Sequence, residues 1–382
     1  MSIKSNNNAY TDSEVLIENE DELDAKYNDE SVYPMNYIKV EKGFYTIFEL
    51  KRKYDSTEKK IILDSDFQRD DVWKPIQKSE LIESILMGLP LPIFYFNEDK
   101  KGRLIVIDGR QRLTALFEYL KNDFSLGKLK VLPELTGKKF RDLDAITQSK
   151  IEDYQIQAHV IQPPTPDRIK FDIFDRVNRA GTQLNKQEIR NALYQGPATK
   201  LLNSICSSNA FEVATDKAFV ENTRMKDKYI VLRFLSFFLY LDKRIIDNGK
   251  TYEYKNDIDD LLGRTMDYLN NCNDSEINDI SKITIGCLEK AYFYLGNNGF
   301  RIISNGRKSP INMNVFECLM FLMVKLPAGN NVIKNSVKAN IHKMLRNEEF
   351  LYSIGDSRDS WAKIEIRFRM VNDIAKEVLK ND

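Results

Sequence analysis

The stretch that decides the fold is Val106–Ala115, which reads VIDGRQRLTA. The apolar run Leu104–Ile107 predicts a buried strand, and apolar residues at helical spacing over 113–120 predict a helix. The two are joined at Asp108-Gly109, where glycine permits a sharp turn and a close approach of the backbone. The sequence therefore predicts a strand, a tight turn and a helix within a mixed α/β domain.

Apolar patterns on both sides of this stretch extend the domain. Pro75 suits the first position of a helix. Asn185 followed by Glu188 has the spacing of a helix N-cap and its partner three residues on. The other expected elements are a short helix at 44–54, buried or alternating strands at 92–96 and 154–162, and a helix at 169–177.

The second half of the chain carries long helical patterns and few strand signals. We therefore predict an α+β protein, with a mixed N-terminal domain at 33–200 and a helical domain at 201–382. Residues 1–32 are polar and acidic and read as a disordered tail. The helical segments are expected at 226–242, 256–270, 279–295, 312–326, 334–346 and 359–380.

The Asp-Gly turn carries the residues with the clearest chemistry. Arg110, Gln111 and Arg112 fall in the first turn of the helix, where unpaired backbone amides bind anions. Two arginines there oppose the helix dipole, so a phosphate-bearing ligand would explain them. Asp108 could hold Mg²⁺ or orient water. The alternative is structural: Asp108 caps the helix and the arginines form ion pairs.

Two further polar clusters accompany the turn. Residues 66–73 read DFQRDDVW. Gln68 and Arg69 of this stretch could reach a ligand. The alternative is that the stretch is a charged loop. Residues 178–190 are rich in Asn, Gln and Arg beyond what a turn and a capped helix need. No P-loop or GxGxxG pattern is present.

Composition excludes several classes of protein. Lys+Arg and Asp+Glu are both 57, so bulk charge does not suit a protein that coats nucleic acid or membrane. The four cysteines lie far apart and the chain has two histidines, so we expect no zinc site and reduced, buried thiols. No apolar run is long enough to span a bilayer and the start has no signal-peptide pattern, so we expect a cytoplasmic protein.

In their order, these motifs resemble those of the GmrSD-type restriction endonuclease N-terminal domain. The matching elements are Phe67-Gln68-Arg69, the helix at 79–86, Pro90-Leu91-Pro92, Ile107–Leu116 with its DGxQR pattern, Phe174–Tyr194, and two short elements at 223–227 and 232–234. The resemblance covers about residues 60–240.

The resemblance implies a ParB/sulfiredoxin-like fold whose strand–turn–helix holds the phosphates of a nucleoside triphosphate (NTP). Relatives hydrolyse NTPs to control attack on foreign or modified DNA. By resemblance, Asp108, Gln111 and Arg112 would be catalytic, with Asp108 also the ligand of Mg²⁺. Gly109, Arg110, Thr114, Gln68, Arg69 and Asn178 would bind the nucleotide.

One departure from the family matters. Many relatives carry a second nuclease domain of the HNH type, which needs paired histidines. Here His159 lies in an expected strand and reads as structural, and His342 has no HNH surroundings. We expect no HNH domain, so cutting would fall to a separate nuclease subunit or be absent. The chain could also form a homo-oligomer.

Three functions remain open from the sequence. The first is an NTPase of an antiphage, DNA-directed restriction system. The second is a nucleotide-responsive binding module without significant hydrolysis. The third is a magnesium-dependent DNA nickase that uses the same pocket. Direct DNA contact would involve Arg301–Lys308 or Lys363, Arg367 and Arg369 near Trp361, although acidic neighbours favour a solvated surface there.

Overall fold

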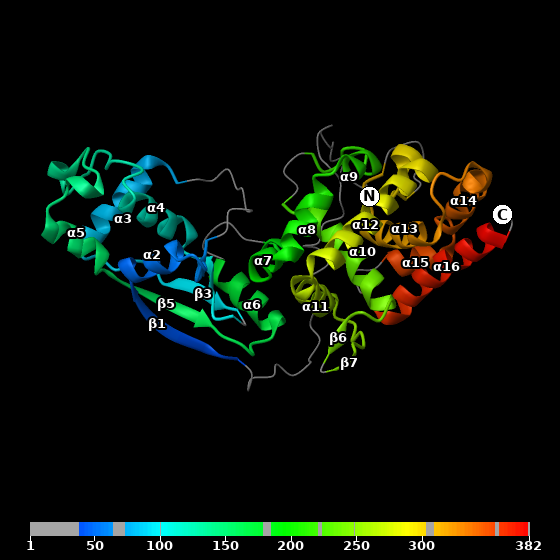
Figure 1. Ribbon diagram of the computed structural model, residues 1–382, viewed down its shortest axis with the longest axis horizontal. Coiled ribbons are helices and arrows are strands. Elements are labelled where there is room, and N and C mark those ends of the chain that lie inside the picture. Colours follow the sequence, from blue (N-terminus) through cyan, green and yellow to red (C-terminus); the bar gives the residue numbers. More distant parts are fainter. Residues whose placement is uncertain are drawn as a thin grey trace, which may run out of the picture. The chain divides into compact units, whose positions relative to one another are not determined.

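The computed structural model describes residues 38–63, 73–99, 101–178, 185–220, 224–247, 249–302, 309–355 and 359–380. Apart from the N-terminal segment, the chain divides between Leu193 and Tyr194 into two compact units. The first unit holds a five-stranded mixed sheet and the second is mainly helical (Figure 1). The predicted α+β class is confirmed. The predicted tail at 1–32 lies outside the described residues.

The sheet of the first unit has the order β1-β5-β3-β4-β2. Strand β1 is antiparallel to β5, and β3 is antiparallel to β4. The β3–β5 and β2–β4 pairs are parallel. A register shift between Tyr95 and Phe96 places Tyr95 opposite Asp108. The strand bounds are Val40–Thr46 (β1), Ile61–Ile62 (β2), Phe94–Glu98 (β3), Leu104–Asp108 (β4) and Gln155–Ile161 (β5).

Four helices pack their apolar sides on one face of this sheet to form its core. They are α2 (Ile47–Asp55), α3 (Pro75–Leu86), α4 (Arg110–Leu120) and α5 (Ala145–Glu152). The strand residues of that core alternate along β3, β4 and β5, as side chains on one face must; they are Ile61, Phe94, Phe96, Leu104, Val106, Ile156, Ala158 and Val160.

Two more helices, α6 (Asp167–Asn178) and α7 (Lys186–Leu193), contact β4. Ile105 and Ile107 alternate with the core residues of β4 and are buried outside that core. Because alternate residues face opposite sides of a strand, α6 and α7 cover the second face of the sheet at β4. Strand β4, which ends at the Asp-Gly turn, is therefore buried on both of its faces.

Two sequence predictions need correction in the first unit and two in the second. The helix expected at 44–54 begins only at Ile47, because Phe44 and Tyr45 pair with β5 and Thr46 caps the helix by accepting from the Glu49 amide. The strand expected from residue 92 begins at Phe94. The helix expected at 279 begins at Asp274, after an Asn273–Glu276 capping box. A short β6–β7 hairpin was not predicted.

The second unit packs its helices around one apolar core. Of the family elements at 223–227 and 232–234, the described part from Arg224 leads into helix α10, and Arg233 lies within that helix. The element bounds are Pro197–Cys206 (α8), Asn209–Ala214 (α9), Lys226–Leu241 (α10), Ile246–Asp247 (β6), Lys250–Thr251 (β7), Ile258–Asn271 (α11), Asp274–Leu295 (α12), Met313–Lys325 (α13), Asn331–Met344 (α14), Glu348–Ile354 (α15) and Trp361–Lys380 (α16).

Four buried charges tie three of these helices together. Arg233 Nε donates to Glu317 Oε2 at 2.8 Å, and its Nη1 donates to Asp359 Oδ2 at 2.8 Å. Arg367 Nη2 lies 3.1 Å from Glu317 Oε1 and 3.0 Å from Asp359 Oδ1. Two guanidiniums and two carboxylates balance one another, which is how buried charges are tolerated.

Two smaller predictions concern the burial of the cysteines and the length of the apolar helices. All four thiols are free, but only Cys287 and Cys318 are buried, while Cys206 and Cys272 are half-buried. The prediction that all four are buried is therefore wrong for two of them, which lie at helix ends. Among the described helices, none is both long enough and apolar enough to cross a membrane.

Candidate functional site

The turn from β4 to α4 requires glycine for two independent reasons. Gly109 has φ +93°, a left-handed conformation that L side chains rarely adopt. A Cβ atom on Gly109 would also lie 2.1 Å from Cδ1 of Phe94, the first residue of β3. The ring of Phe94 therefore fills the space directly beside the turn, and the backbone passes close over it.

Helix α4 begins at this glycine without a side-chain cap. The first intrahelical bond runs from the Leu113 amide to the Gly109 carbonyl at 2.9 Å, and no side chain of the cap residue accepts from the helix. The amides of the first turn have no acceptor within the helix, so this end has the polarity that attracts anions. The structural alternative in which Asp108 is the helix cap is wrong, because the cap position is Gly109.

Arg112 is buried and held by three neighbours. Its Nη2 donates to Asp108 Oδ2 at 2.6 Å, and its Nη1 donates to the Pro92 carbonyl. Its Cζ lies 4.2 Å from the centroid of the Phe94 ring, a cation–π distance. Burial lowers the pKa of Arg112, and the charge of Asp108 acts in the opposite direction. Arg112 thus joins the turn, the end of β4 and the segment before β3.

This geometry divides the roles within the DGRQR motif. Both terminal nitrogens of Arg112 donate to protein acceptors, so its first effect is to fix the Asp108 carboxylate. Asp108 keeps 38% of its side chain exposed. Its Oδ1 has no hydrogen bond to any described residue. One carboxylate oxygen therefore stays available beside the uncapped helix end.

The other predicted site residues are placed as follows. Arg110 is half-buried at the first position of α4, Gln111 is exposed, and Thr114 is half-buried one turn on. Asn178 is the last residue of α6, which contacts β4, and its side chain lies outside what is described. Gln68 and Arg69 also lie outside the described residues. The structure thus brings together the six predicted residues of 108–114.

Helix α7 explains much of the polar excess noted in the sequence around 178–190. The Asn185 amide donates to Glu188 Oε2 at 2.7 Å and the Glu188 amide donates to Asn185 Oδ1 at 2.8 Å, so the predicted N-cap pair is confirmed. Arg190 is fully buried, donates to Gln187 Oε1 at 2.6 Å and lies over the Phe171 ring. These side chains support the packing of α7 against β4.

The basic residues near Trp361 are mostly structural. Arg367 belongs to the buried ion cluster, Lys363 is buried over the Tyr352 ring, and Arg369 pairs with Glu349 at 2.5 Å. The structure does not favour a DNA contact by Arg367 or Lys363, because both side chains are buried. Most of the segment 301–308 lies outside the described residues.

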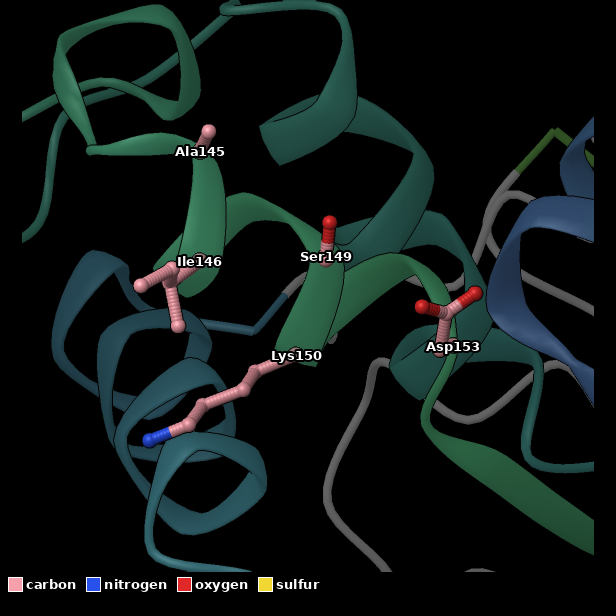
Figure 2. Close-up of a pocket in the computed structure, with 5 residues that line it drawn as sticks. All are labelled: Ala145, Ile146, Ser149, Lys150 and Asp153. Carbon is pink, nitrogen blue, oxygen red and sulfur yellow. The ribbon is translucent and has the colours of Figure 1, made fainter.

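Neither metal-binding side chains nor the pocket described next gives a second candidate site within the described ranges. Within the described ranges, no three His, Cys, Asp or Glu side chains gather as they would around a metal ion. A hollow of about 490 Å³ lies along one side of α5, lined by Ala145, Ile146, Ser149, Lys150 and Asp153 (Figure 2). The Lys150 amino group points away from the Asp153 carboxylate there, and none of the predicted site residues line this hollow.

Sequence reasoning missed Phe94 and Pro92 as parts of the site. Both lie in the segment that enters β3, some fifteen residues before the turn, and they reach it only through the β3–β4 pairing. The one signal was the Pro90-Leu91-Pro92 element, which fixes an extended chain just before the strand.

With this geometry established, the comparison with known families is informative. Residues 44–195 match the family model of the GmrSD restriction endonuclease, N-terminal domain. This confirms the resemblance seen in the motifs, and the matched range holds the whole sheet except the first residues of β1, together with α2 to α7. No curated protein and no solved structure gives a significant match to the chain.

Proposed function

We propose that this protein binds and hydrolyses nucleoside triphosphates, with Mg²⁺, as a component of a DNA-directed restriction system that acts against phage. The GmrSD match supports the restriction-type role. The nucleotide chemistry is supported by one observation above all: α4 begins at Gly109 without a side-chain cap, with two arginines in its first turn.

In this proposal the phosphates lie over the first turn of α4. The turn amides and Arg110 bind phosphate oxygens, and Gln111, which is exposed, lies within reach of the same ligand. Thr114 lies one turn further on. Gly109 keeps the start of α4 in place, because a larger residue would shift the turn away from Phe94.

Asp108 acts on water or on the metal ion. Mg²⁺ in nucleotide sites is held by one or two carboxylates together with the phosphates, so a single carboxylate with an available oxygen fits it. Bound there, Mg²⁺ would neutralise charge on the phosphates. Arg112 is a positioning residue in this arrangement, since it holds Asp108 through Oδ2 and leaves Oδ1 to face the ligand.

The test is phosphate release from ATP, GTP, CTP and UTP with Mg²⁺, with and without duplex DNA. Arg110→Ala is the informative variant, and Arg141→Ala is its control, because Arg141 is 70% exposed and pairs only loosely with Asp142 at 3.7 Å. We expect turnover in the wild type and the control and at least a tenfold loss in Arg110→Ala. Turnover that Arg110→Ala leaves unchanged would contradict the proposal.

Two other outcomes identify the alternatives. Nucleotide affinity without phosphate release would indicate the responsive binding module. Nicking of plasmid DNA with Mg²⁺ alone, lost in Arg110→Ala, would indicate a nickase that uses the same turn.

A further inference from the structure

The second face of the sheet, which α6 and α7 cover at β4, is open at β1 and carries a row of aromatic and polar side chains. Lys42 of β1 pairs in register with His159 of β5, and His159 pairs with Tyr95 of β3. Cross-strand partners lie on the same face, so these three side chains form a row across three strands. The His159 and Tyr95 rings stack, with centroids 5.3 Å apart and planes 16° apart.

Phe44 extends this row along the edge of the sheet. It lies two residues from Lys42 on β1, and therefore on the same face, opposite Gln157 of β5. Its side chain is 63% exposed, the most exposed of the phenylalanines described. A single exposed apolar side chain is common on protein surfaces, so Phe44 points to a binding surface only together with the stacked rings and the lysine beside it.

Lys42 supplies a positive charge to this row. Lys42 is exposed and forms no ion pair within the described part of the chain. The acidic residue nearest in sequence, Glu41, lies on the opposite face and pairs with Lys39 at 3.5 Å. Phe44, Gln157, His159 and Tyr95 add no negative charge to it.

From this combination we infer that the open face of the sheet binds unpaired bases of single-stranded nucleic acid. The exposed Phe44 ring, with the half-buried Tyr95 and His159 rings beside it, can stack on bases of any sequence, and the lysine can contact the phosphates. Two strand spacings separate β1 from β3, about 10 Å, and in RNA-binding domains of the RRM type the aromatic rings on a four-stranded sheet stack two or three bases. A Gln amide beside the rings can contact base edges.

This inference goes beyond the proposed function, because it needs no nucleotide at the Asp-Gly turn. The surface, defined by Lys42, Phe44, Tyr95, Gln157 and His159, reaches the turn only at its Tyr95 end, since Tyr95 lies opposite Asp108. A bound strand would therefore pass next to the site where hydrolysis is proposed. Because the two sites are adjacent, bound nucleic acid could change the rate of NTP hydrolysis.

The test is fluorescence anisotropy of a labelled oligothymidylate of about 12 nucleotides, titrated with the full chain and no NTP. We expect binding by the wild type and a loss of about 5- to 150-fold in Phe44→Ala, since one stacked base is worth roughly 1–3 kcal/mol. Phe44→Trp should restore it. Lys42→Gln should lower the salt dependence of log K by about 0.7 per decade.

The matched control is Phe48→Ala. Phe48 lies on α2 and is 54% exposed, close to Phe44 in exposure but not on this face of the sheet. Its substitution should leave affinity unchanged. The inference is overturned if the wild type does not bind, if Phe44→Ala and His159→Ala bind like the wild type, or if Phe48→Ala loses as much affinity as Phe44→Ala.

Two measurements separate this inference from its rivals. A duplex of the same length that binds equally well would overturn it, because paired bases cannot stack on the rings. A dimer that Phe44→Ala dissociates without changing oligothymidylate affinity would assign the face to a second copy instead. Arg110→Ala should keep oligothymidylate affinity, so the two proposals can fail separately.

Discussion

At the scale of single residues, Gly109 and Arg112 decide the geometry of the candidate site. Gly109 provides a left-handed turn over the Phe94 ring, and Arg112 fixes Asp108 at the end of β4. The two are coupled through Phe94, which touches both. A substitution at the turn should therefore affect both the fold and the ligand.

We predict that Gly109→Ala lowers the free energy of unfolding of the first unit. The left-handed conformation costs about 1–2 kcal/mol for a residue with a Cβ, and overpacking against Phe94 adds about 1–3 kcal/mol. Gly88→Ala is the control, because Gly88 also has a positive φ, +70°, but no atom within 4 Å of the added Cβ. Urea denaturation measures both. Equal losses in the two variants would show that Phe94 does not constrain the turn.

At the scale of elements, the sequence predicted the pieces better than their partners. The strand at 104–107, the turn and the helix after it were predicted because their apolar periodicity and their glycine are local signals. The helix at 44–54 was mistaken at its start because Phe44 and Tyr45 fit either element until β5 is known to pair with them. Phe94 was missed for the same reason: strand pairing is a long-range property.

The buried ion cluster is the element-scale feature that no local pattern predicted. Arg233 in α10, Glu317 in α13, and Asp359 and Arg367 at α16 come from three distant parts of the sequence. In the sequence, Arg233 was identified only as part of the family element at 232–234. Its role follows from packing, since its side chain is 1% exposed.

We predict that Arg233→Ala costs about 3–5 kcal/mol of unfolding free energy, because it leaves buried carboxylates without their partner. Arg264→Ala is the control: Arg264 is also doubly paired, with Asp260 and Asp247, but its side chain is 31% exposed. An exposed pair contributes about 1 kcal/mol or less. Thermal or urea unfolding of both variants distinguishes them, and equal losses would refute a special role for the cluster.

The same cluster predicts an acid-sensitive second unit. Burial raises the pKa of Asp359, but Arg233 and then Arg367 outweigh it, so the pKa lies below its usual range. A carboxyl with a lowered pKa stabilises the fold above its unfolded pKa of about 3.9, and this stability is lost as the pH falls below that. Asp359→Asn should therefore lose less unfolding free energy than the wild type between about pH 4 and pH 2.

The control for that pH dependence is Asp373→Asn, since Asp373 is 65% exposed. It should follow the wild-type curve. A wild-type loss of stability below pH 4 that Asp359→Asn fully retains would show that another group is responsible.

At the scale of the whole molecule, two separate cores imply two folding units. The first core is built from residues 47–160 and the second from residues 198–378. We predict that fragments ending at Leu193 and beginning at Tyr194 each fold alone, with cooperative unfolding measured by circular dichroism. A first fragment without cooperative unfolding would contradict the division.

The family match also belongs to this scale. It covers the first unit and ends at residue 195, close to the division of the chain. The second unit therefore has to be understood from its own structure, in which Lys363 and Arg367 of α16 are buried. The nucleic-acid contact that we propose lies on the first unit, where Lys42 and Phe44 of β1 are exposed.

The most direct test of the central proposal is the affinity of the full chain for a magnesium nucleotide, measured by isothermal titration calorimetry. Affinity at the Asp-Gly turn is required for the NTPase and for the responsive module alike. We predict binding by the wild type and by Arg141→Ala, and at least tenfold weaker binding by Arg110→Ala. A wild-type protein that binds none of the four nucleoside triphosphates would contradict the assignment of this turn as a nucleotide site.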